Sequence, residues 1–260
     1  MKTSKIEWTE ATWNPSIGCT KVSEGCQNCY AEVMAKRLQA MGVDDYKDGF
    51  KFKILPHRLE LPFKTKKPTK FFVNSMSDLW HEEMPEEFLD QIFEVIKKTP
   101  QHTYQLLTKR AENMEKYFKN KVIPKNVWLG VTVECKRTRP RIDCLRNIDA
   151  KIKFLSLEPL LEDLGELNLK NIDWAIVGGE SGAKARPMKE EWVLNIKEQC
   201  KKQETAFFFK QWGTWGADGV RRSKKANGRT LLNKIWDEYP EKISIPPKSR
   251  ELKIKQEQLI

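Results

Sequence analysis

Short runs of β-forming apolar residues alternate with segments of helical periodicity along most of this chain. Six such runs are predicted to be strands, at residues 70–76, 103–109, 126–134, 152–158, 173–179 and 205–212. Between them, apolar residues recur at helical spacing, as in residues 86–98 and 189–202. Strands that are apolar on both faces must be covered on both faces, so this alternation requires a parallel sheet packed against helices.

A further strand near residues 11–17, followed by a helix at 30–41, brings the predicted sheet to about seven parallel strands. With 260 residues and 39% apolar content, the chain is long enough to bury such a core. We therefore expect an α/β fold, an incomplete (βα) barrel, with a doubly wound open sheet as the alternative. The barrel is expected over residues 1–239, with an insertion at about 42–69 and a charged C-terminal tail at 240–260.

The chain is strongly basic. It has 47 lysines and arginines against 36 acidic residues, a formal net charge of +11. The excess is visible in residues 63–70, 135–146 and 220–225, and such fields attract polyanions, including nucleic acid. Solvated lysine-rich faces are the alternative explanation. No stretch approaches the ~20 apolar residues of a membrane span, so we expect a cytoplasmic protein with no membrane partner.

Three of the six cysteines, Cys19, Cys26 and Cys29, fall within eleven residues of one another. The remaining cysteines, which ordinary packing explains, are Cys135, Cys144 and Cys200. A reducing compartment keeps thiols free, and the lopsided spacing is unlike that of a disulfide framework. The clustered trio therefore indicates a metal or iron–sulfur site.

Polar residues gather where the predicted strands end. These strand ends are Asn74 to Asp78, Thr108 to Arg110, Glu134, Glu158, Gly178 to Gly182, and Lys210 to Trp212. In βα folds the carboxyl ends of the strands meet at one edge, where loops converge over the open end of the sheet. The cysteine loop follows the first predicted strand, so we expect it at this same rim.

Three thiolates suit two kinds of site. They can hold three irons of a [4Fe–4S] cluster and leave the fourth iron open for a ligand. A structural zinc site needs four ligands, and His57 or His81 could supply the fourth in a nucleic-acid-binding protein. The spacing alone does not decide between them. A third hypothesis takes Glu134, Glu158 and Glu180 as the acid and base of a hydrolase, but it leaves the cysteines unexplained.

Several segments together resemble one protein superfamily. They are TWNPSIGC and GCQNCYAE around the cysteines, and NSMSDLWHE, LLTKR, NVWLGVTVE, FLSLEPLL, VGGESGAKARPM and FFFKQWG further along. The three-cysteine loop after the first strand of a βα barrel resembles the radical S-adenosylmethionine superfamily. The full set, over most of residues 8–216, most closely resembles an uncharacterised phage-associated and bacterial family placed in or beside that superfamily. The cysteine spacing departs from the usual pattern, with six and then two intervening residues instead of three and then two.

The resemblance implies a [4Fe–4S] cluster held by Cys19, Cys26 and Cys29, with S-adenosylmethionine bound at the open iron. It also implies reductive cleavage of that cofactor and hydrogen abstraction from a substrate by a 5′-deoxyadenosyl radical. A reductase or other electron donor is then required. Lys21, in the same loop, is expected to lower the pKa of the cysteines.

The nature of the substrate and partners is suggested by aromatic residues near the rim. Trp13, Trp80, Trp212 and Trp215 offer stacking surface, although packing is their commoner role. Together with the basic runs they favour a nucleic acid or nucleotide substrate. The exposed basic tail is compatible with a partner protein.

Ten strand-end residues are candidates for binding the cofactor. Ser75, Ser77 and Asp78 stand where the superfamily binds the cofactor amino group with a Gly-Gly-Glu-like segment, so we expect them near its aminoacyl part. Lys109 and Arg110 are candidate partners of the cofactor carboxylate. The others are Glu134 and Glu158 for ribose hydroxyls or the amine, Gly178 and Gly179 for close backbone approach, and Glu180 beside them. No catalytic residue is assigned.

Overall fold

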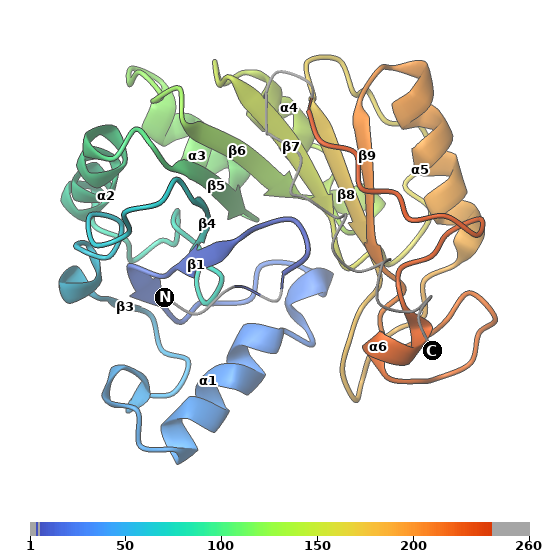
Figure 1. The fold of residues 1–260 in the computed structure, drawn as a ribbon, viewed down its shortest axis with the longest axis horizontal. Coiled ribbons are helices and arrows are strands. Elements are labelled where there is room, and N and C mark those ends of the chain that lie inside the picture. The colour runs from blue at the N-terminus through green and yellow to red at the C-terminus, as the bar shows by residue number, and fades with distance from the viewer. Residues whose placement is uncertain (1–3, 5, 241–260) are drawn as a thin grey trace, which may run out of the picture.

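Seven parallel strands form one curved sheet in the computed structural model, which describes residue 4 and residues 6–240 (Figure 1). The strands are β1 (Ala11–Trp13), β4 (Lys70–Val73), β5 (Thr103–Thr108), β6 (Val127–Thr132), β7 (Ile152–Leu157), β8 (Trp174–Gly178) and β9 (Ala206–Gln211). Their order across the sheet is β1-β4-β5-β6-β7-β8-β9. The tail expected at 240–260 lies, after residue 240, outside the described residues.

The sheet is a half-barrel, because β1 and β9 are its two edges and do not pair with each other. Strand order follows chain order throughout, whereas a doubly wound sheet changes direction at a switch point. The expected incomplete (βα) barrel of seven parallel strands is therefore confirmed. Each of the six strands predicted after residue 69 begins within one residue of its predicted start.

The strand predicted at residues 11–17 is divided in two. β1 joins the large sheet, whereas β2 (Ser16–Ile17) pairs antiparallel with β3 (Lys53–Ile54). Pro15 lies between β1 and β2 and has no N–H to donate to a ladder, so the pairing with β4 ends there. Residues 42–69 contain β3 and two short 3-10 helices, η2 (Asp44–Tyr46) and η3 (Pro56–Arg58).

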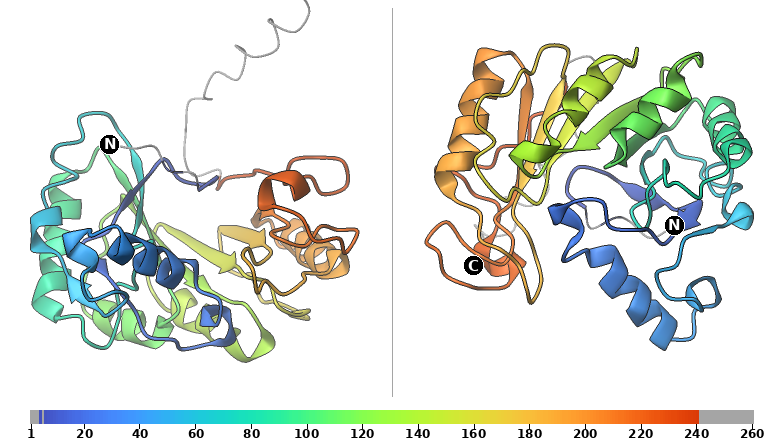
Figure 2. Two further views of the ribbon diagram at one scale, coloured as in Figure 1. Left: turned by 90° about the horizontal axis from the view of Figure 1, so that it is seen from below. Right: turned by 180° about the vertical axis from the view of Figure 1, so that it is seen from behind.

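Helices cover the convex face of the sheet and flank its open end. They are α1 (Tyr30–Ala40), α2 (Glu86–Lys98), α3 (Ala111–Phe118), α4 (Arg141–Arg146), α5 (Glu190–Lys202) and α6 (Lys224–Asn227), with 3-10 turns η1 (Glu24–Cys26) and η4 (Lys136–Thr138). α2 to α5 pack on the convex side, and α1 and α6 lie below the sheet in Figure 1, on either side of its open end (Figure 2). One unit of the repeat lacks its helix: residues 158–173, between β7 and β8, contain neither helix nor strand.

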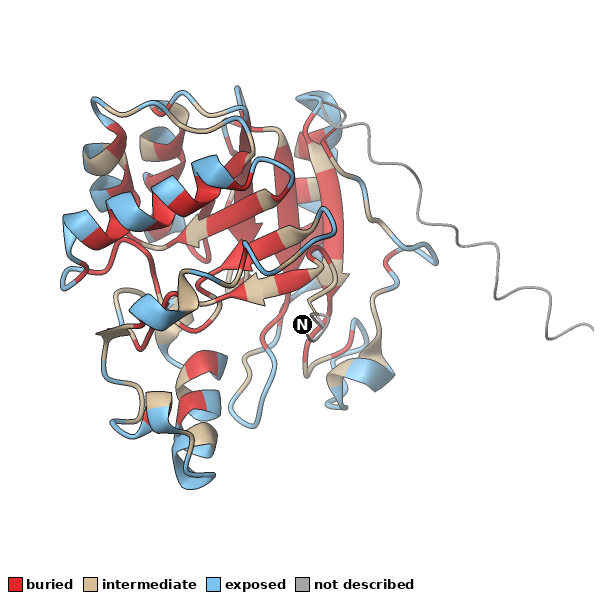
Figure 3. Cartoon of the chain, turned by 60° about the vertical axis from the view of Figure 1, so that its left-hand side comes forward, coloured by how far each residue is buried: buried red, intermediate tan, exposed pale blue. Residues whose placement is uncertain are grey.

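Helix α2 shows why the outer layer forms. Its buried side chains recur along one face, at Phe88, Leu89, Ile92, Phe93, Val95 and Ile96. Glu86 and Glu87 lie in the first turn and Lys97 and Lys98 in the last, where their charges complement the helix dipole. Figure 3 shows the resulting pattern, with buried strands inside and exposed outer faces on the surrounding helices. No helix in the described part of the chain is both long and apolar enough to cross a membrane.

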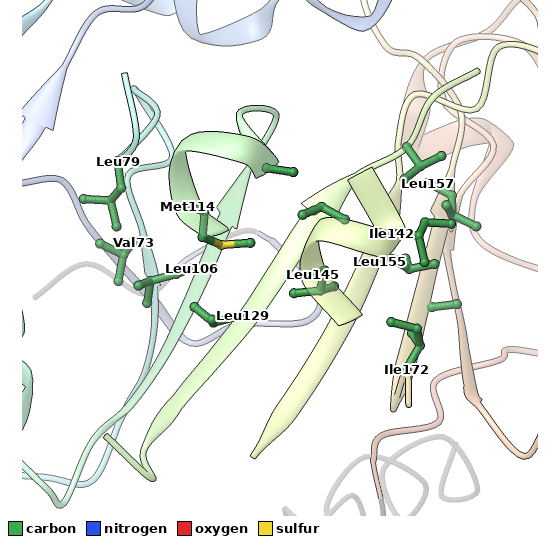
Figure 4. Close-up of a cluster of buried hydrophobic side chains, with 14 of the residues drawn as sticks. Val73, Leu79, Leu106, Met114, Leu129, Ile142, Leu145, Leu155, Leu157 and Ile172 are labelled. Atoms are coloured by element: carbon green, nitrogen blue, oxygen red, sulfur yellow. The ribbon is translucent and has the colours of Figure 1, made fainter. Parts of the chain in front are cut away.

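The main core lies between the convex face of the sheet and helices α2 to α5. In Figure 4, Leu106 of β5 and Leu129 of β6 lie beside Met114 of α3, and Leu155 of β7 lies beside Ile142 of α4. Continuous apolar strands are needed because the opposite, concave face is also filled at its base.

A second cluster fills the base of the concave face, and we call it the aromatic floor. Its members are Trp8, Phe72, Trp128, Ile152, Phe154, Trp174, Ile176 and Phe208. Along β7, Phe154 belongs to this floor while its neighbour Leu155 belongs to the main core, as the alternation of a strand requires. Several of its ring pairs pack edge to face, with the Trp8 and Phe72 ring centroids 4.8 Å apart, and the pairs that involve Phe154 are tilted.

Gly130, in the middle of β6, is required by the ring of Phe154. The two residues are register partners on adjacent strands, and a Cβ atom on residue 130 would overlap the Phe154 ring. A glycine in a central strand normally weakens it, so its presence here reflects close packing rather than strand preference.

We predict that Gly130→Ala lowers the free energy of unfolding by about 1–3 kcal/mol, because the added methyl group overpacks the concave face. The measurement is urea unfolding followed by circular dichroism. In a Phe154→Leu background the same substitution should cost clearly less, because the smaller side chain leaves room. An equal cost in both backgrounds would show that the Phe154 ring is not the cause.

Candidate functional site

The cysteine loop, residues 18–29, lies across the carboxyl ends of the strands. Gly18 forms a bridge with Ser77 after β4, and Cys19 and Thr20 contact Arg110 after β5. Ser23 donates a hydrogen bond to Glu134 after β6, and Asn28 donates one to Glu180 after β8. The cysteine loop therefore lies at the rim of the sheet, where we expected it.

All three cysteines of the loop are free and half-buried. Sγ of Cys19 accepts a hydrogen bond from Nη1 of Arg110 at 3.4 Å, and Sγ of Cys26 lies 3.8 Å from Oγ of Ser23. Cys29 is the N-cap residue of α1, immediately before the helix begins at Tyr30.

The other three cysteines lie outside the loop. Cys135 and Cys200 are buried, and Cys144 is half-buried. Cys200 belongs to the main core and Cys144 packs against it, in line with the packing role expected for both. Cys135 borders the cysteine loop, because its Sγ lies 3.5 Å from Oε2 of Glu24.

The thiols of the loop could serve a zinc ion or an iron–sulfur cluster. Among residues 4 and 6–240, no three or more His, Cys, Asp or Glu side chains converge so as to hold a single metal ion. His57 faces Asp45, and His81 contacts Thr20 while its ring stacks on Phe52. A zinc ion draws all of its ligands to about 2 Å from one point, whereas thiolates of an iron–sulfur cluster bind separate irons. The three half-buried thiols of the loop supply three of the soft sulfur ligands that both kinds of group use, and no histidine of the described residues stands beside them as a fourth ligand.

Arg110 joins the cysteine loop to the strand ends. Its side chain is only 4% exposed, and all three guanidinium nitrogens have partners. Nε donates to Glu82 at 2.8 Å, Nη2 donates to Oγ1 of Thr20 at 2.7 Å, and Nη1 faces Asp78 at 3.4 Å as well as Cys19. The position of Arg110 at the rim was predicted from the sequence. Its contact with Cys19 was not, because no local sequence pattern indicates that the two residues meet.

Burial and charge act in opposite directions on Cys19. Burial is the main influence and, with the nearby charge of Asp78, raises the pKa of the thiol to about 11, although Arg110 lowers it. Lys21, expected to favour the thiolates, instead faces Glu32 at 3.2 Å. Among the described residues, Arg110 rather than Lys21 is thus the cation in contact with a thiol of the trio.

The segment after β4 holds the loop through side chains predicted to bind the cofactor. Oγ of Ser77 donates to the carbonyl of Gly18 at 2.6 Å, and Oγ of Ser75 donates to Asn14 at 3.1 Å. Asp78 is buried and accepts hydrogen bonds from Oγ1 of Thr108 at 2.6 Å and from the backbone N–H groups of two further residues. The chain itself occupies the polar atoms of all three residues.

Lys109 differs from its neighbours, because its ammonium group has no hydrogen-bond or ion-pair partner in the described part of the chain. It is half-buried and borders a cavity of about 350 Å³ beside the cysteine loop. Arg137 and Arg141 also line this cavity, together with the carboxylates of Glu82 and Glu112.

Glu134 is completely buried and holds the middle of the cysteine loop. Oε2 accepts a hydrogen bond from Nη1 of Arg141 at 2.9 Å, and Oε1 accepts one from Oγ of Ser23. Gly25 lies against the same carboxylate, and a Cβ atom there would be 2.9 Å from Oε1. Arg141 was missed by sequence reasoning, since nothing local marks the partner of Glu134.

Glu180 holds the end of the loop through a two-pronged ion pair. Nη2 and Nε of Arg186 lie 2.6 and 2.9 Å from its two carboxylate oxygens, and Asn28 donates to it at 3.2 Å. Burial raises the pKa of Glu180, but the hydrogen bonds from Arg186 and Asn28 outweigh it and leave that pKa lowered. Arg186 also donates to the carbonyl of Glu24 at 3.0 Å.

Gly178 and Gly179 are close to protein atoms. A Cβ atom on Gly178 would overlap the carboxylate of Glu158, and one on Gly179 would overlap the carbonyl of Trp212. We expected a cofactor or substrate to approach the backbone of these glycines closely. In this structure the atoms that approach it belong to Glu158 and Trp212.

A charged pair stands on the concave face above the aromatic floor. Nζ of Lys210, near the end of β9, lies 3.0 Å from Oε1 of Glu158, which follows β7. Their side chains are 18% and 12% exposed. Strand alternation places them there, because Phe154 and Phe208 of the floor precede them on the same face. β8 runs between β7 and β9, and its Gly178 leaves room for the pair to meet.

Lys210 belongs to one of the polar strand ends, but no role was predicted for it from the sequence. Its partner Glu158 was a candidate in its own right, and their separation of 52 residues hides the pairing. The structure thus brings nine of the ten strand-end candidates into contact with protein partners and leaves the side chain of Lys109 facing a cavity.

We predict that Glu180→Gln lowers the free energy of unfolding by about 1–3 kcal/mol at pH 7, because the buried carboxylate loses its charge-assisted bonds to Arg186. The folded-state pKa of Glu180 is lowered, so this contribution is present above its ordinary value of 4.5 and declines as pH falls below it. Urea unfolding at pH 7 and at successively lower pH values tests this.

The difference between wild type and Glu180→Gln should therefore narrow in acid. Glu191→Gln, at an exposed position in the first turn of α5, is the matched control and should show little difference at any pH. A difference for Glu180→Gln that is constant with pH would contradict a role for the ionised carboxylate.

Comparisons with known proteins place the chain in a family. Spore photoproduct lyase complexed with dinucleoside spore photoproduct is 12% identical, with a TM-score of 0.45, over 78% of this chain and 64% of that one. A mutant of that lyase with bound AdoMet and the dinucleoside has a TM-score of 0.43 at 12% identity, with the same coverage of 78% and 64%. A tyrosine-to-phenylalanine mutant has a TM-score of 0.46 at 13% identity, over 86% of this chain and 72% of that one.

This chain thus spans less than two thirds of the first lyase structure, and no curated protein matches it in sequence. A family model described as "Protein of unknown function (DUF5131)" matches residues 3–240. The chain therefore belongs to the DUF5131 family.

Proposed function

We propose that this chain is a radical S-adenosylmethionine enzyme in which Cys19, Cys26 and Cys29 hold a [4Fe–4S] cluster. The observation that carries the proposal is the placement of three free, half-buried thiols on one loop over the carboxyl ends of a parallel half-barrel. Cluster chemistry requires an iron left open for a ligand, which three thiolates allow and four do not. Several sequence motifs that resemble the superfamily, among them NVWLGVTVE and FLSLEPLL, run along a strand and end at this rim.

The cluster and its bound cofactor would supply the radical chemistry, and the protein would position them. When bound, the cluster and S-adenosylmethionine would supply one-electron cleavage of the sulfonium and a 5′-deoxyadenosyl radical for hydrogen abstraction. Arg110 would hold Cys19 in place and balance the negative charge of a thiolate. The aromatic floor would keep water away from the base of the concave face.

The candidate residues divide into two roles. We assign direct contact with S-adenosylmethionine to Lys109, through its unpaired ammonium group, and to Glu158, through its carboxylate on the concave face. The others we assign to positioning, because their contacts hold the cysteine loop or a neighbouring strand end in place: Ser75, Ser77, Asp78, Arg110, Glu134, Gly178, Gly179 and Glu180. Lys210, beside the acceptor Glu158, would be a donor toward cofactor or substrate.

We further propose that the substrate is a nucleic acid or nucleotide and that the enzyme works in the cytoplasm with a reductase or other electron donor. The net charge of +11 supports a polyanionic substrate. Residues 1–239 would form the catalytic unit, with 42–69 as an insertion in it, and the charged segment 240–260 is a candidate site for a partner protein.

The test of the reaction is anaerobic reconstitution with iron and sulfide, reduction with dithionite, and chromatography for 5′-deoxyadenosine after addition of S-adenosylmethionine. We expect a brown protein that forms 5′-deoxyadenosine. A colourless protein that carries one zinc ion and forms none would favour the alternative, a nucleic-acid-binding protein with a structural zinc site.

The ligand assignment is tested separately. We predict that Cys26→Ala loses most of the reconstituted iron and the visible absorption while the far-ultraviolet circular dichroism stays that of a folded half-barrel. Cys144→Ala, which removes a half-buried thiol from helix α4, is the control and should keep both. Retention of a full cluster by Cys26→Ala would remove Cys26 from the ligand set.

The role of the concave face has its own prediction. Glu158→Gln should weaken binding of S-adenosylmethionine to the reconstituted protein by about tenfold, because a charged acceptor becomes a neutral one. Isothermal titration calorimetry measures this, with the exposed Glu87→Gln of α2 as control. Unchanged affinity would assign the Glu158–Lys210 pair to the substrate or to stability.

A further inference from the structure

Two loops at the open end of the half-barrel are joined into one surface. They are residues 181–186, after β8, and residues 213–223, after β9, which leads into α6 (Figure 1). Oγ1 of Thr214 accepts a hydrogen bond from the N–H of Gly182 at 2.9 Å, and Nε1 of Trp215 donates to the carbonyl of Ala185 at 2.7 Å. Arg221 also donates to the backbone of the first loop. We call residues 181–186 and 213–229 the basic platform.

The platform carries a large excess of positive charge. It contains seven cationic side chains, Lys184, Arg186, Arg221, Arg222, Lys224, Lys225 and Arg229, and one acidic side chain, Asp218. Residues 181–184, 217–223 and 225 are exposed. Lys184, Arg221, Arg222 and Lys225 are therefore presented to solvent. Two half-buried cations of the platform, Arg186 and Lys224, instead pair with Glu180 and Glu7 outside it.

Several of these charges are not neutralised within the protein. The Asp218 carboxylate forms an ion pair with Arg222, whose Nη2 lies 2.7 Å from Oδ2. Arg221 contacts a backbone carbonyl and the ring of Trp215, whose centroid lies 6.0 Å away, so no carboxylate balances it. Lys184 and Lys225 have no ion-pair partner among residues 4 and 6–240. Such a field is available to an external anion.

The platform adjoins the cysteine loop directly. Nδ2 of Asn28, next to Cys29, donates to the carbonyl of Lys184 at 2.9 Å. Arg186 donates to the carbonyl of Glu24 at 3.0 Å, on the other side of Cys26. A polymer lying on the platform would thus reach the rim where the three cysteines lie.

We propose that the basic platform binds the phosphate backbone of a polynucleotide and delivers one of its nucleotides to the open end of the half-barrel. The delivery rests on the proposed function, whereas the binding does not. Arginine and lysine side chains on a loop surface match regularly spaced phosphates, which supply most of the affinity in sequence-independent recognition.

The composition of the platform argues against a protein partner. Protein interfaces depend on buried aromatic and aliphatic anchors, whereas nucleic-acid interfaces are polar and positively charged. Val220 is the exposed large apolar residue in the described platform, at 47% exposure. Trp215 is half-buried, and its indole N–H is already bonded to Ala185.

The experiment is fluorescence anisotropy with the full-length protein and a short labelled DNA oligonucleotide, single-stranded and as a duplex, over a range of KCl concentrations. Binding should weaken linearly with the logarithm of salt concentration. Lys184→Glu with Lys225→Glu should weaken it at least about tenfold and reduce the salt slope by about two. Neither lysine contacts the cysteine ligands, so the reconstituted iron content should stay at the wild-type level.

The matched control carries the same change in net charge on the convex side. Lys98→Glu with Lys202→Glu alters two exposed lysines of α2 and α5 and should leave binding close to wild type. An equal loss in both double variants would overturn the platform in favour of general charge attraction. Wild-type protein that does not bind, or that binds polyglutamate as well as DNA, would overturn it too.

The two proposals can fail independently. Anisotropy needs no cluster, so a protein that forms 5′-deoxyadenosine but does not bind DNA would overturn the platform alone. A protein that binds DNA through the platform but forms no 5′-deoxyadenosine would overturn the radical reaction alone.

Discussion

Three carboxylate–arginine pairs, each with a buried carboxylate, hold the cysteine loop against the sheet, and the arrangement of the site depends on them. Asp78, Glu134 and Glu180 each follow a strand, and each faces an arginine, Arg110, Arg141 or Arg186. Each pair also touches the loop, at Cys19, Ser23 and Asn28 respectively. Because strands of a parallel sheet end at one edge, a single loop can meet all three pairs.

Such pairs fix geometry more than they add stability. Removing charges from water costs several kcal/mol for each ion, and the attraction within the pair roughly offsets that cost. Loss of one partner is different, because it leaves an uncompensated charge in a buried place. The loop is therefore held in one position by interactions that tolerate little change, which suits the proposed role of its three thiols.

The fold could be predicted from the sequence because its signal is local. Each strand is a continuous apolar run, and each outer helix carries its apolar residues on one face. The strands and helices of residues 70–212 can therefore be predicted from local sequence. Two details of the fold were not predicted. Pro15 divides the first strand, and the segment between β7 and β8 crosses without a helix.

The site could be predicted only in outline. Position at a strand end identified Asp78, Glu134 and Glu180 as rim residues, but their partners lie on other elements. Arg141 follows Glu134 by seven residues and Arg186 follows Glu180 by six, at distances where no periodic pattern marks an ion pair. Lys210 is further still from Glu158. Long-range pairing depends on the register of strands, which composition and spacing do not encode.

Glycines at the strand ends illustrate the same limit. Gly178 and Gly179 suggested room for a ligand, yet the carboxylate of Glu158 and the carbonyl of Trp212 lie against them. A missing side chain shows that something approaches closely, and only the structure shows what it is. At Gly178 the result is a charged pair on the concave face, which is itself a reason to place cofactor or substrate there.

Arg186 links the two surfaces assigned here. Its guanidinium bonds to Glu180 and to the backbone of Glu24, while it belongs to the basic platform. A phosphate drawn to the platform would compete with Glu180 for that guanidinium, and Glu180 also holds Asn28 beside Cys29. In the proposed arrangement, binding of a polynucleotide and the position of the cysteine loop are therefore coupled through one side chain, which would let substrate binding influence the site at which the cofactor reacts.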